Sequence, residues 1–298
     1  MTHTQRWMVS VVVTAALTVL WSPTTTISSA QTAPSLEPTL VARAIQPGEV
    51  VRVDVTCECR GVAPLASAFD LDISLTLSPD RTRWQGLIGI DVDVAPGEYQ
   101  LVLTAPHLEP PPLHKTTLRV QPKKFRTRTL RVAPKYVDPP PDQVKRLLRE
   151  AALLKDIYKT VTPRKWDRAF ALPLSTQPNH NFGSRSVFNS QPRSPHAGID
   201  FSSPTGTVVK APAAGRVVLA DDLYFTGNTV VIDHGGAVYS VFAHLSAMTV
   251  SGDDGVEPGA TLGRVGATGR VTGPHLHWSV RLNGARVDPL SLLVATED

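Results

Sequence analysis

The stretch Gly273-Pro274-His275-Leu276-His277-Trp278, close to the C-terminus, decides how the rest of the chain is interpreted. Two histidines separated by one residue and followed by the alternating run Trp278-Ser279-Val280 predict a β-strand. Side chains at positions i and i+2 of a strand leave on the same face, so both imidazoles are expected to point into one space. Taken alone, this pair also fits two surface histidines on an edge strand.

Further histidines in the same region favour a metal site over a surface pair. His196 precedes Asp200 by four residues, His244 lies in the run Phe242 to Ser246, and six of the nine histidines fall within 180–277. A catalytic zinc site needs three protein ligands and one open position for water. His196, Asp200 and one member of the His-x-His pair supply two imidazoles and a carboxylate, but the spacing does not say which member.

The composition is that of a globular protein that can hold two domains. Of the 298 residues, 42% are hydrophobic and 19% are charged, which excludes a disordered chain and a polytopic membrane protein. The net charge of +4 is compatible with an anionic polymer such as a cell wall as a neighbour. Without an RNA-type aromatic motif or a long Lys/Arg tract, no nucleic-acid partner is expected.

Residues 1–30 are predicted to be a signal peptide. A short basic start leads into the apolar run from Trp7 to Trp21, and Ser28-Ser29-Ala30 places small residues at the cleavage site. The apolar run is short for a membrane span, and no basic stop-transfer cluster follows it. We therefore expect cleavage after Ala30, no stable membrane span afterwards, and a periplasmic, cell-envelope or extracellular location. The absence of a cysteine at the cleavage point argues against a lipoprotein.

Residues 31–40 are expected to be a polar spacer, and residues 41–132 a small β-sandwich, because short alternating strands recur there between turns. Further strands are expected at 71–77, 116–120 and 126–132. The two cysteines, Cys57 and Cys59, would lie too far apart in a regular strand for an unstrained disulfide. A strained local bridge, two free thiols and an intermolecular bond all remain open. The module itself carries no chemical motif.

Residues 133–169 are expected to be a Pro-rich linker followed by an amphipathic helix. Apolar residues from Val144 to Ile157 recur at helical spacing, and Pro141 suits a first helical turn. A helix of about 20 residues that ends before Pro163 fits a brace packed by its apolar face.

Residues 170–298 are expected to be a compact antiparallel β domain, in a chain whose fold class is all-β. Glycines punctuate short apolar strands, as the turns of such a fold require. His234 is expected at a hairpin turn, where it is structural or solvated rather than catalytic. The expected strands are 207–211, 215–220, 228–233, 238–244, 261–265 and 275–281.

The three histidine motifs resemble those of the lysostaphin/LytM family of zinc metallopeptidases, which cut peptide cross-links in bacterial peptidoglycan. The motifs are His196-x-x-x-Asp200, Phe242-Ala243-His244-Leu245-Ser246 and His275-Leu276-His277, within a resemblance that spans 182–290. The resemblance implies Zn²⁺ held by His196, Asp200 and His277. It also implies that His244 and His275 form a catalytic pair beside the metal.

The resemblance implies an exported endopeptidase acting on peptidoglycan stem peptides or cross-bridges. Two other functions remain open: a non-catalytic relative that activates a separate amidase, and a zinc peptidase acting on proteins or short peptides. Some family members are latent because an upstream residue fills the fourth zinc position. Asn179, His180 and Asn181 are the candidates for such a residue here, and a regulatory protein partner that relieves the inhibition also remains open.

Overall fold

The computed structural model describes residues 35–130 and 139–297. The expected signal peptide, its cleavage site after Ala30 and the first part of the expected spacer lie outside the described residues. Within the described part, no helix combines the length and the apolarity that a membrane crossing requires.

A two-sheet β-sandwich occupies the first part of the described chain, as expected. Alternating apolar side chains from both sheets, such as Val51, Val53, Leu101 and Leu103, fill one shared hydrophobic core. The first sheet has the order β1-β2-β6-β5 and the second the order β4-β3-β7-β8, with antiparallel neighbours. The strands are β1 (Glu37–Val41), β2 (Val50–Thr56), β3 (Leu65–Ala68), β4 (Leu71–Ile73), β5 (Thr76–Leu77), β6 (Trp84–Gly89), β7 (Gly97–Thr104) and β8 (Leu113–Val120).

One boundary of the sandwich differs from the sequence expectations, and one of the open alternatives for the cysteines is decided. β1 begins at Glu37, inside the segment expected as a spacer, because residues from Glu37 onward pair with β2 in antiparallel register. Cys57 and Cys59 form a disulfide with their Cα atoms 5.2 Å apart. The geometry of a regular strand does not apply to this pair, because β2 ends at Thr56 and the cysteines lie in irregular chain.

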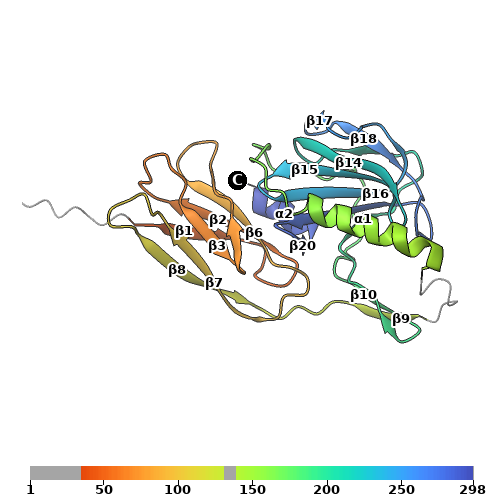
Figure 1. The fold of residues 1–298 in the computed structure, drawn as a ribbon, viewed down its shortest axis with the longest axis horizontal. Coiled ribbons are helices and arrows are strands. Elements are labelled where there is room, and N and C mark those ends of the chain that lie inside the picture. Colours follow the sequence, from red (N-terminus) through yellow and green to blue (C-terminus); the bar gives the residue numbers. More distant parts are fainter. Residues whose placement is uncertain (1–34, 131–138, 298) are drawn as a thin grey trace, which may run out of the picture. The chain divides into compact units, whose positions relative to one another are not determined.

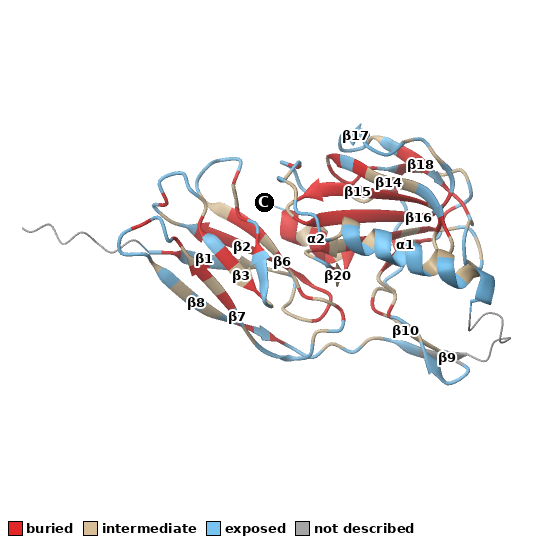
Figure 2. Cartoon of the chain, viewed as in Figure 1, coloured by how far each residue is buried: buried red, intermediate tan, exposed pale blue. Residues whose placement is uncertain are grey.

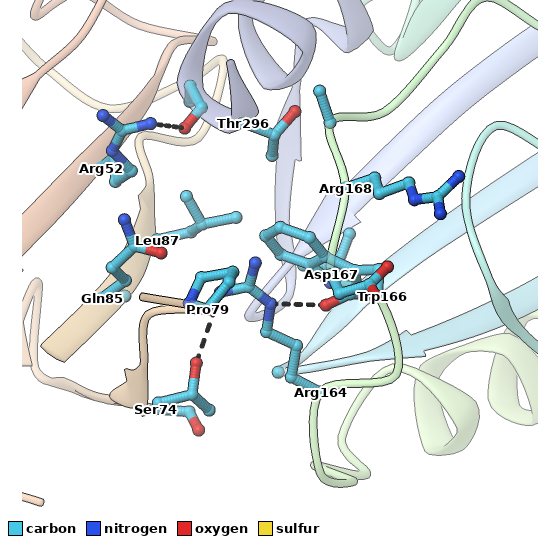
Figure 3. A pocket seen from close by; sticks show the side chains of 16 residues that line it. Arg52, Ser74, Pro79, Gln85, Leu87, Arg164, Trp166, Asp167, Arg168 and Thr296 are labelled. Carbon is cyan, nitrogen blue, oxygen red and sulfur yellow. Dashed lines mark hydrogen bonds between the residues drawn. The ribbon is translucent and has the colours of Figure 1, made fainter. Parts of the chain in front are cut away.

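The outer face of β2 is buried as well. Val50 belongs to the second large hydrophobic core of the molecule, and its backbone N–H donates to Ser291 Oγ at 2.8 Å. The Arg52 guanidinium donates to the carbonyl oxygens of Ala295 and Glu297 at the C-terminus, and Figure 3 shows this side chain close to Thr296. This contact explains why all residues of β2 except its last are buried, although the sequence alternates.

The strand expected at 126–132 is present as β9 (Thr127–Leu130), but it does not belong to the sandwich. It pairs in parallel with β10 (Arg185–Phe188), which in turn pairs with β11 (Gln191–Pro192). The sequence could not predict this pairing, since its partners are separated by more than 50 positions.

The linking helix is α1 (Val144–Ile157), preceded by the 3₁₀ turn η2 (Pro141–Gln143). At 14 residues it is shorter than the expected length. Its last turn packs against three buried side chains of the following sheet, Val231, Tyr239 and Val241. Figure 1 shows α1 lying along β16, as expected for a brace packed by its apolar face.

A nine-stranded, largely antiparallel sheet carries the histidine motifs and confirms the all-β class. Its main path is β12-β19-β16-β15-β14-β17, with β13, β18 and β20 paired beside it. β15 and β16 are almost entirely buried (Figure 2), and Trp278, Phe201 and Phe242 are among the largest buried side chains. The strands are β12 (Gly198–Phe201), β13 (Val208–Lys210), β14 (Gly215–Leu223), β15 (Gly227–Gly235), β16 (Val238–Met248), β17 (Gly255–Val256), β18 (Thr261–Val265), β19 (Leu276–Leu282) and β20 (Ala285–Val287).

A short terminal helix, α2 (Pro289–Thr296), was not expected. Asp288 caps it by accepting a hydrogen bond from Leu290 N at 3.0 Å, and Pro289 occupies the first turn. This Asp-Pro pair is the signal that predicts the helix.

Candidate metal centre

Strand pairing brings two of the expected ligands side by side. β12 and β19 are antiparallel neighbours, and Asp200 lies directly opposite His277. Gly198, two residues before Asp200, is required for this arrangement. A Cβ at Gly198 would lie 2.8 Å from His277 Nε2 and 2.4 Å from the carbonyl oxygen of Trp278.

His196 approaches from the loop that precedes β12. Two backbone hydrogen bonds hold this loop: Gly183 N–H donates to the carbonyl oxygen of His196, and His196 N–H donates to that of Ser184. His196 Nδ1 lies 3.2 Å from the carbonyl oxygen of Asn181, which can only accept, so Nδ1 carries the proton. The lone pair of Nε2 is then available, and Nε2 lies 3.2 Å from Asp200 Oδ1.

Together these three residues form a donor set that fits a metal ion. One ligand atom each from His196, Asp200 and His277 lies within 4.8 Å of the others, and within 35–130 and 139–297 no other group of three His, Cys, Asp or Glu residues meets this condition. His277 Nδ1 is 2.9 Å from Asp200 Oδ1. Two imidazoles and one carboxylate are the ligand types of catalytic zinc sites.

The protonation states of the group also suit a metal. Burial opposes ionisation of Asp200, but the contacts of its carboxylate with His196 and His277 outweigh this effect, so the pKa of Asp200 lies well below its ordinary value. Burial lowers the pKa of His277 and favours the neutral imidazole. An ionised carboxylate and neutral imidazoles are the forms that bind metal.

Asn181 supports the group from behind. Its Nδ2 donates to Asp200 Oδ2 at 2.7 Å, its Oδ1 accepts from Asp200 N at 3.3 Å, and its carbonyl orients His196. The two other residues considered for the fourth metal position lie differently. Asn179 donates to Ser202 Oγ at 3.2 Å, and His180 is exposed.

His244 and His275 form a second pair beside the ligands. Their ring centroids are 4.8 Å apart, and His275 Nε2 lies 3.9 Å from Asp200 Oδ1. His244 Nδ1 donates to the carbonyl oxygen of Thr268 at 3.0 Å, and His275 Nδ1 to that of Gly273 at 2.8 Å. In both rings Nε2 is therefore left as the acceptor.

The backbone of His244 is strained in a way that points to function. Its φ of 65° lies in the left-handed region that few non-glycine residues adopt, and Leu245, which follows it, borders a register shift in the pairing of β16 with β18. Burial, and the positive charge that His277 can carry, lower the pKa of His244 to about 4. His244 is therefore a neutral proton acceptor near pH 7.

His234 belongs to neither pair. It is fully buried near the end of β15 rather than solvated, and its Nδ1 donates to the carbonyl oxygen of Ala214 at 2.8 Å. Its ring packs edge-on against Phe170, with the centroids 4.9 Å apart.

Several cavities open in the described part of the chain, and two of them adjoin the loop that supports the ligand group. Two adjoining cavities are both lined by His180, Asn181 and Ser184, next to the ligand group. Another cavity, which encloses about 580 Å³ near Trp166, has no histidine among its lining residues (Figure 3). Asn181, which supports Asp200, connects the first two cavities to the ligand group.

Residues 194–289, which contain all five residues of the two groups, match the model of peptidase family M23. A crystal structure of a peptidase M23 from Pseudomonas aeruginosa is 33% identical, with a TM-score of 0.67, and the match covers 85% of this chain and 97% of that chain. The similarity therefore extends over the sandwich as well as the nine-stranded sheet.

Two curated relatives match the C-terminal region alone. The DD-carboxypeptidase/endopeptidase Mpg of Neisseria meningitidis is 42% identical over 103 residues, which are 35% of this chain and 24% of the relative. The peptidoglycan DD-endopeptidase ShyA of Vibrio cholerae is 41% identical over 96 residues, which are 32% of this chain and 22% of the relative. The chain spans about a quarter of the length of the curated relatives it matches.

Proposed function

The chain belongs to peptidase family M23, and we propose that it is an exported zinc metalloendopeptidase that hydrolyses peptide cross-links of bacterial peptidoglycan. The observation that carries the proposal is the convergence of His196, Asp200 and His277 within 4.8 Å, with His244 and His275 beside them. A degenerate, non-catalytic relative would lack part of this set.

We assign the metal to His196 Nε2, Asp200 Oδ1 and His277 Nδ1. The hydrogen bond from His196 Nδ1 to Asn181 and the bond from Asn181 Nδ2 to Asp200 Oδ2 orient two of these ligands. When bound, Zn²⁺ acts as a Lewis acid and lowers the pKa of a water ligand towards neutrality.

His244 and His275 handle the proton and the developing negative charge. With both Nδ1 atoms donating to backbone carbonyls, each Nε2 can accept a proton from the attacking water or, once protonated, donate to the attacked carbonyl oxygen. The lowered pKa of His244 keeps its ring neutral at neutral pH, so the Nε2 lone pair is free. The protonated pair then returns the proton to the leaving amine.

The substrate and the location follow from the relatives and from the N-terminal sequence. The curated relatives Mpg and ShyA carry endopeptidase names, and peptidoglycan stem peptides or cross-bridges are accordingly the proposed substrate. Residues 1–30 are the proposed signal peptide, which places the enzyme in the periplasm or cell envelope. We further propose that a regulatory protein partner controls access to the site.

Digestion of purified peptidoglycan by the zinc-loaded protein tests the function. Mass spectrometry of the released fragments should identify products in which a cross-link has been hydrolysed, and a chelator should abolish their release. A folded protein that binds no metal and releases no fragment would point to the non-catalytic activator. A protein that cleaves proteins but not peptidoglycan would point to a general peptidase.

A further inference from the structure

Residues 121–130, which follow the last strand of the sandwich and are called the linker below, run directly beside the loop that leads to His196. Arg185 N donates to the carbonyl oxygen of Arg126 at 2.8 Å, and from Thr127 onward β9 continues in parallel with β10. The linker therefore lies against the loop that leads from Asn181 to His196.

Aromatic packing fixes this segment in place. The Phe125 ring meets the Phe182 ring edge-on at 6.3 Å between centroids. A Cβ at Gly183 would lie 2.2 Å from the Phe125 ring, so only glycine permits this approach. Phe182 directly follows Asn181, the residue that supports Asp200.

The adjoining cavities between the linker and the loop share the residues Arg126, His180, Asn181 and Ser184. The larger one encloses about 850 Å³, open solvent included. Asn181, which lines both cavities, donates through Nδ2 to Asp200 at 2.7 Å, so the cavities adjoin the loop that supports the metal group. A peptide substrate that extends past the metal group on this side would meet the linker.

The fixed charges around these cavities leave an uncompensated positive side. The acidic residues Glu49 and Asp288 are already engaged, because Arg43 contacts both and Lys123 contacts Glu49 at 2.6 Å. Lys124 and Arg126 are also lining residues, and both are exposed. Neither forms an ion pair with any residue of the described ranges.

We propose that Arg126, assisted by Lys124, binds a free carboxylate of the stem peptide and so makes the linker one wall of the substrate groove. This inference rests on the proposed function and adds a specificity determinant to it. A guanidinium matches a carboxylate through two parallel hydrogen bonds, and the side chain is not committed to a protein carboxylate. Stem peptides carry free carboxylates next to their cross-links, whereas neutral glycine bridges do not.

The test uses the zinc-loaded full chain and two synthetic cross-linked peptide dimers. The dimers are identical except that the free carboxylates of the second are converted to amides. We expect the wild type to cleave the acidic dimer with a kcat/KM about tenfold higher than the amide. Arg126→Gln should lower kcat/KM for the acidic dimer to about that for the amide, and it should change the amide rate much less.

Further variants separate the possible outcomes. Lys124→Gln should reduce the preference partially, and Lys115→Gln, at an exposed position of β8 away from the cavities, should leave it intact. Equal cleavage of both dimers by the wild type would overturn the carboxylate subsite without affecting the proposed function. Cleavage of neither dimer nor peptidoglycan would instead overturn the proposed function. A loss of binding to whole cell walls with an unchanged dimer preference would reassign the two cations to an anionic wall polymer.

Discussion

Asn181 and Asp200 are joined by two hydrogen bonds. Asn181 Nδ2 donates to Asp200 Oδ2 at 2.7 Å, and the Asp200 N–H donates to Asn181 Oδ1 at 3.3 Å. Asp200 Oδ2 is thereby occupied by a donor, while Oδ1 faces His196 and His277. This arrangement selects which carboxylate oxygen is presented to a metal ion. To fill the fourth metal position, the Asn181 side chain would have to release Asp200. We therefore assign Asn181 a positioning role.

Asn181→Ala should therefore weaken zinc binding by about 10- to 100-fold, because Asp200 loses its orienting partner, while the backbone carbonyl that accepts from His196 is kept. Competition with a chromophoric chelator measures the dissociation constant. Asn179→Ala is the matched control, since that side chain contacts Ser202 instead. Unchanged zinc affinity in Asn181→Ala would show that the amide does not position the ligand.

Removal of a ligand should have a larger effect. His277→Ala or Asp200→Ala deletes one of three ligand atoms, so each variant should lose stoichiometric zinc together with activity. Metal content after dialysis gives the readout, with His114→Ala on β8 as a control that retains zinc. If either ligand variant kept one zinc per chain, the ligand assignment would be incorrect.

The strands and the grouping of the histidines could be predicted from the sequence, whereas most contacts between distant segments could not. Periodicity places β14, β15, β16 and β18 close to their observed bounds, because alternation and glycine turns are local signals. The support of Asp200 by Asn181 leaves no such local signal, since it joins a loop residue to a strand residue 19 positions away. The burial of Val50 and Arg52 against α2 is likewise a long-range contact between residues more than 240 positions apart.

His234 shows the same limit at a single residue. The dipeptide Gly235-Gly236 correctly indicates a turn, but only the packed structure shows that His234 itself is buried against Phe170. Its burial depends on Ala214 and on the segment around Trp166, which lie on other parts of the chain.

The catalytic histidines should separate from the ligands in their effects. His244→Ala and His275→Ala should keep zinc and lower kcat by about a hundredfold or more, because each acts in the transition state. If the two act as a unit, the double variant loses much less than the product of the single losses. Zinc content, melting temperature and rate are measured on the same preparations. Restoration of the His244→Ala rate by added zinc would show that His244 supports a ligand instead.

Burial of His234 should make the stability depend on pH. Burial lowers its pKa from 6.5 in the unfolded chain to about 4, while Asp233 opposes and Lys165 reinforces this shift. The unfolded chain therefore binds the proton more readily between these values. The free energy of unfolding is therefore highest above pH 6.5. It falls by roughly 3 kcal/mol in total as the pH drops towards 4.

His234→Asn tests this dependence, because its amide can still donate to the carbonyl of Ala214. Urea unfolding at pH 4.5, 5.5, 6.5 and 7.5 gives the free energy of unfolding of both proteins. Below pH 6.5 the wild type should lose stability relative to the variant as the pH falls. Above pH 6.5 the difference between their free energies of unfolding should be constant. A difference that does not change with pH would show that His234 does not contribute the acid sensitivity.

The last prediction concerns the attachment of the sandwich to the nine-stranded sheet. Arg286 on β20 contacts Asp91 at 2.6 Å and Asp93 at 2.8 Å, and all three side chains are at least half-buried. Because these charges are partly shielded from water, a double-mutant cycle of Arg286→Gln and Asp91→Asn should give a coupling of about 1–3 kcal/mol. The control cycle uses Arg119 and Glu98, an exposed pair within the sandwich, whose coupling should stay below about 1 kcal/mol. Equal coupling in the two cycles would mean that Arg286 does not fasten the sandwich, and Val50 with its buried neighbours would then carry the attachment.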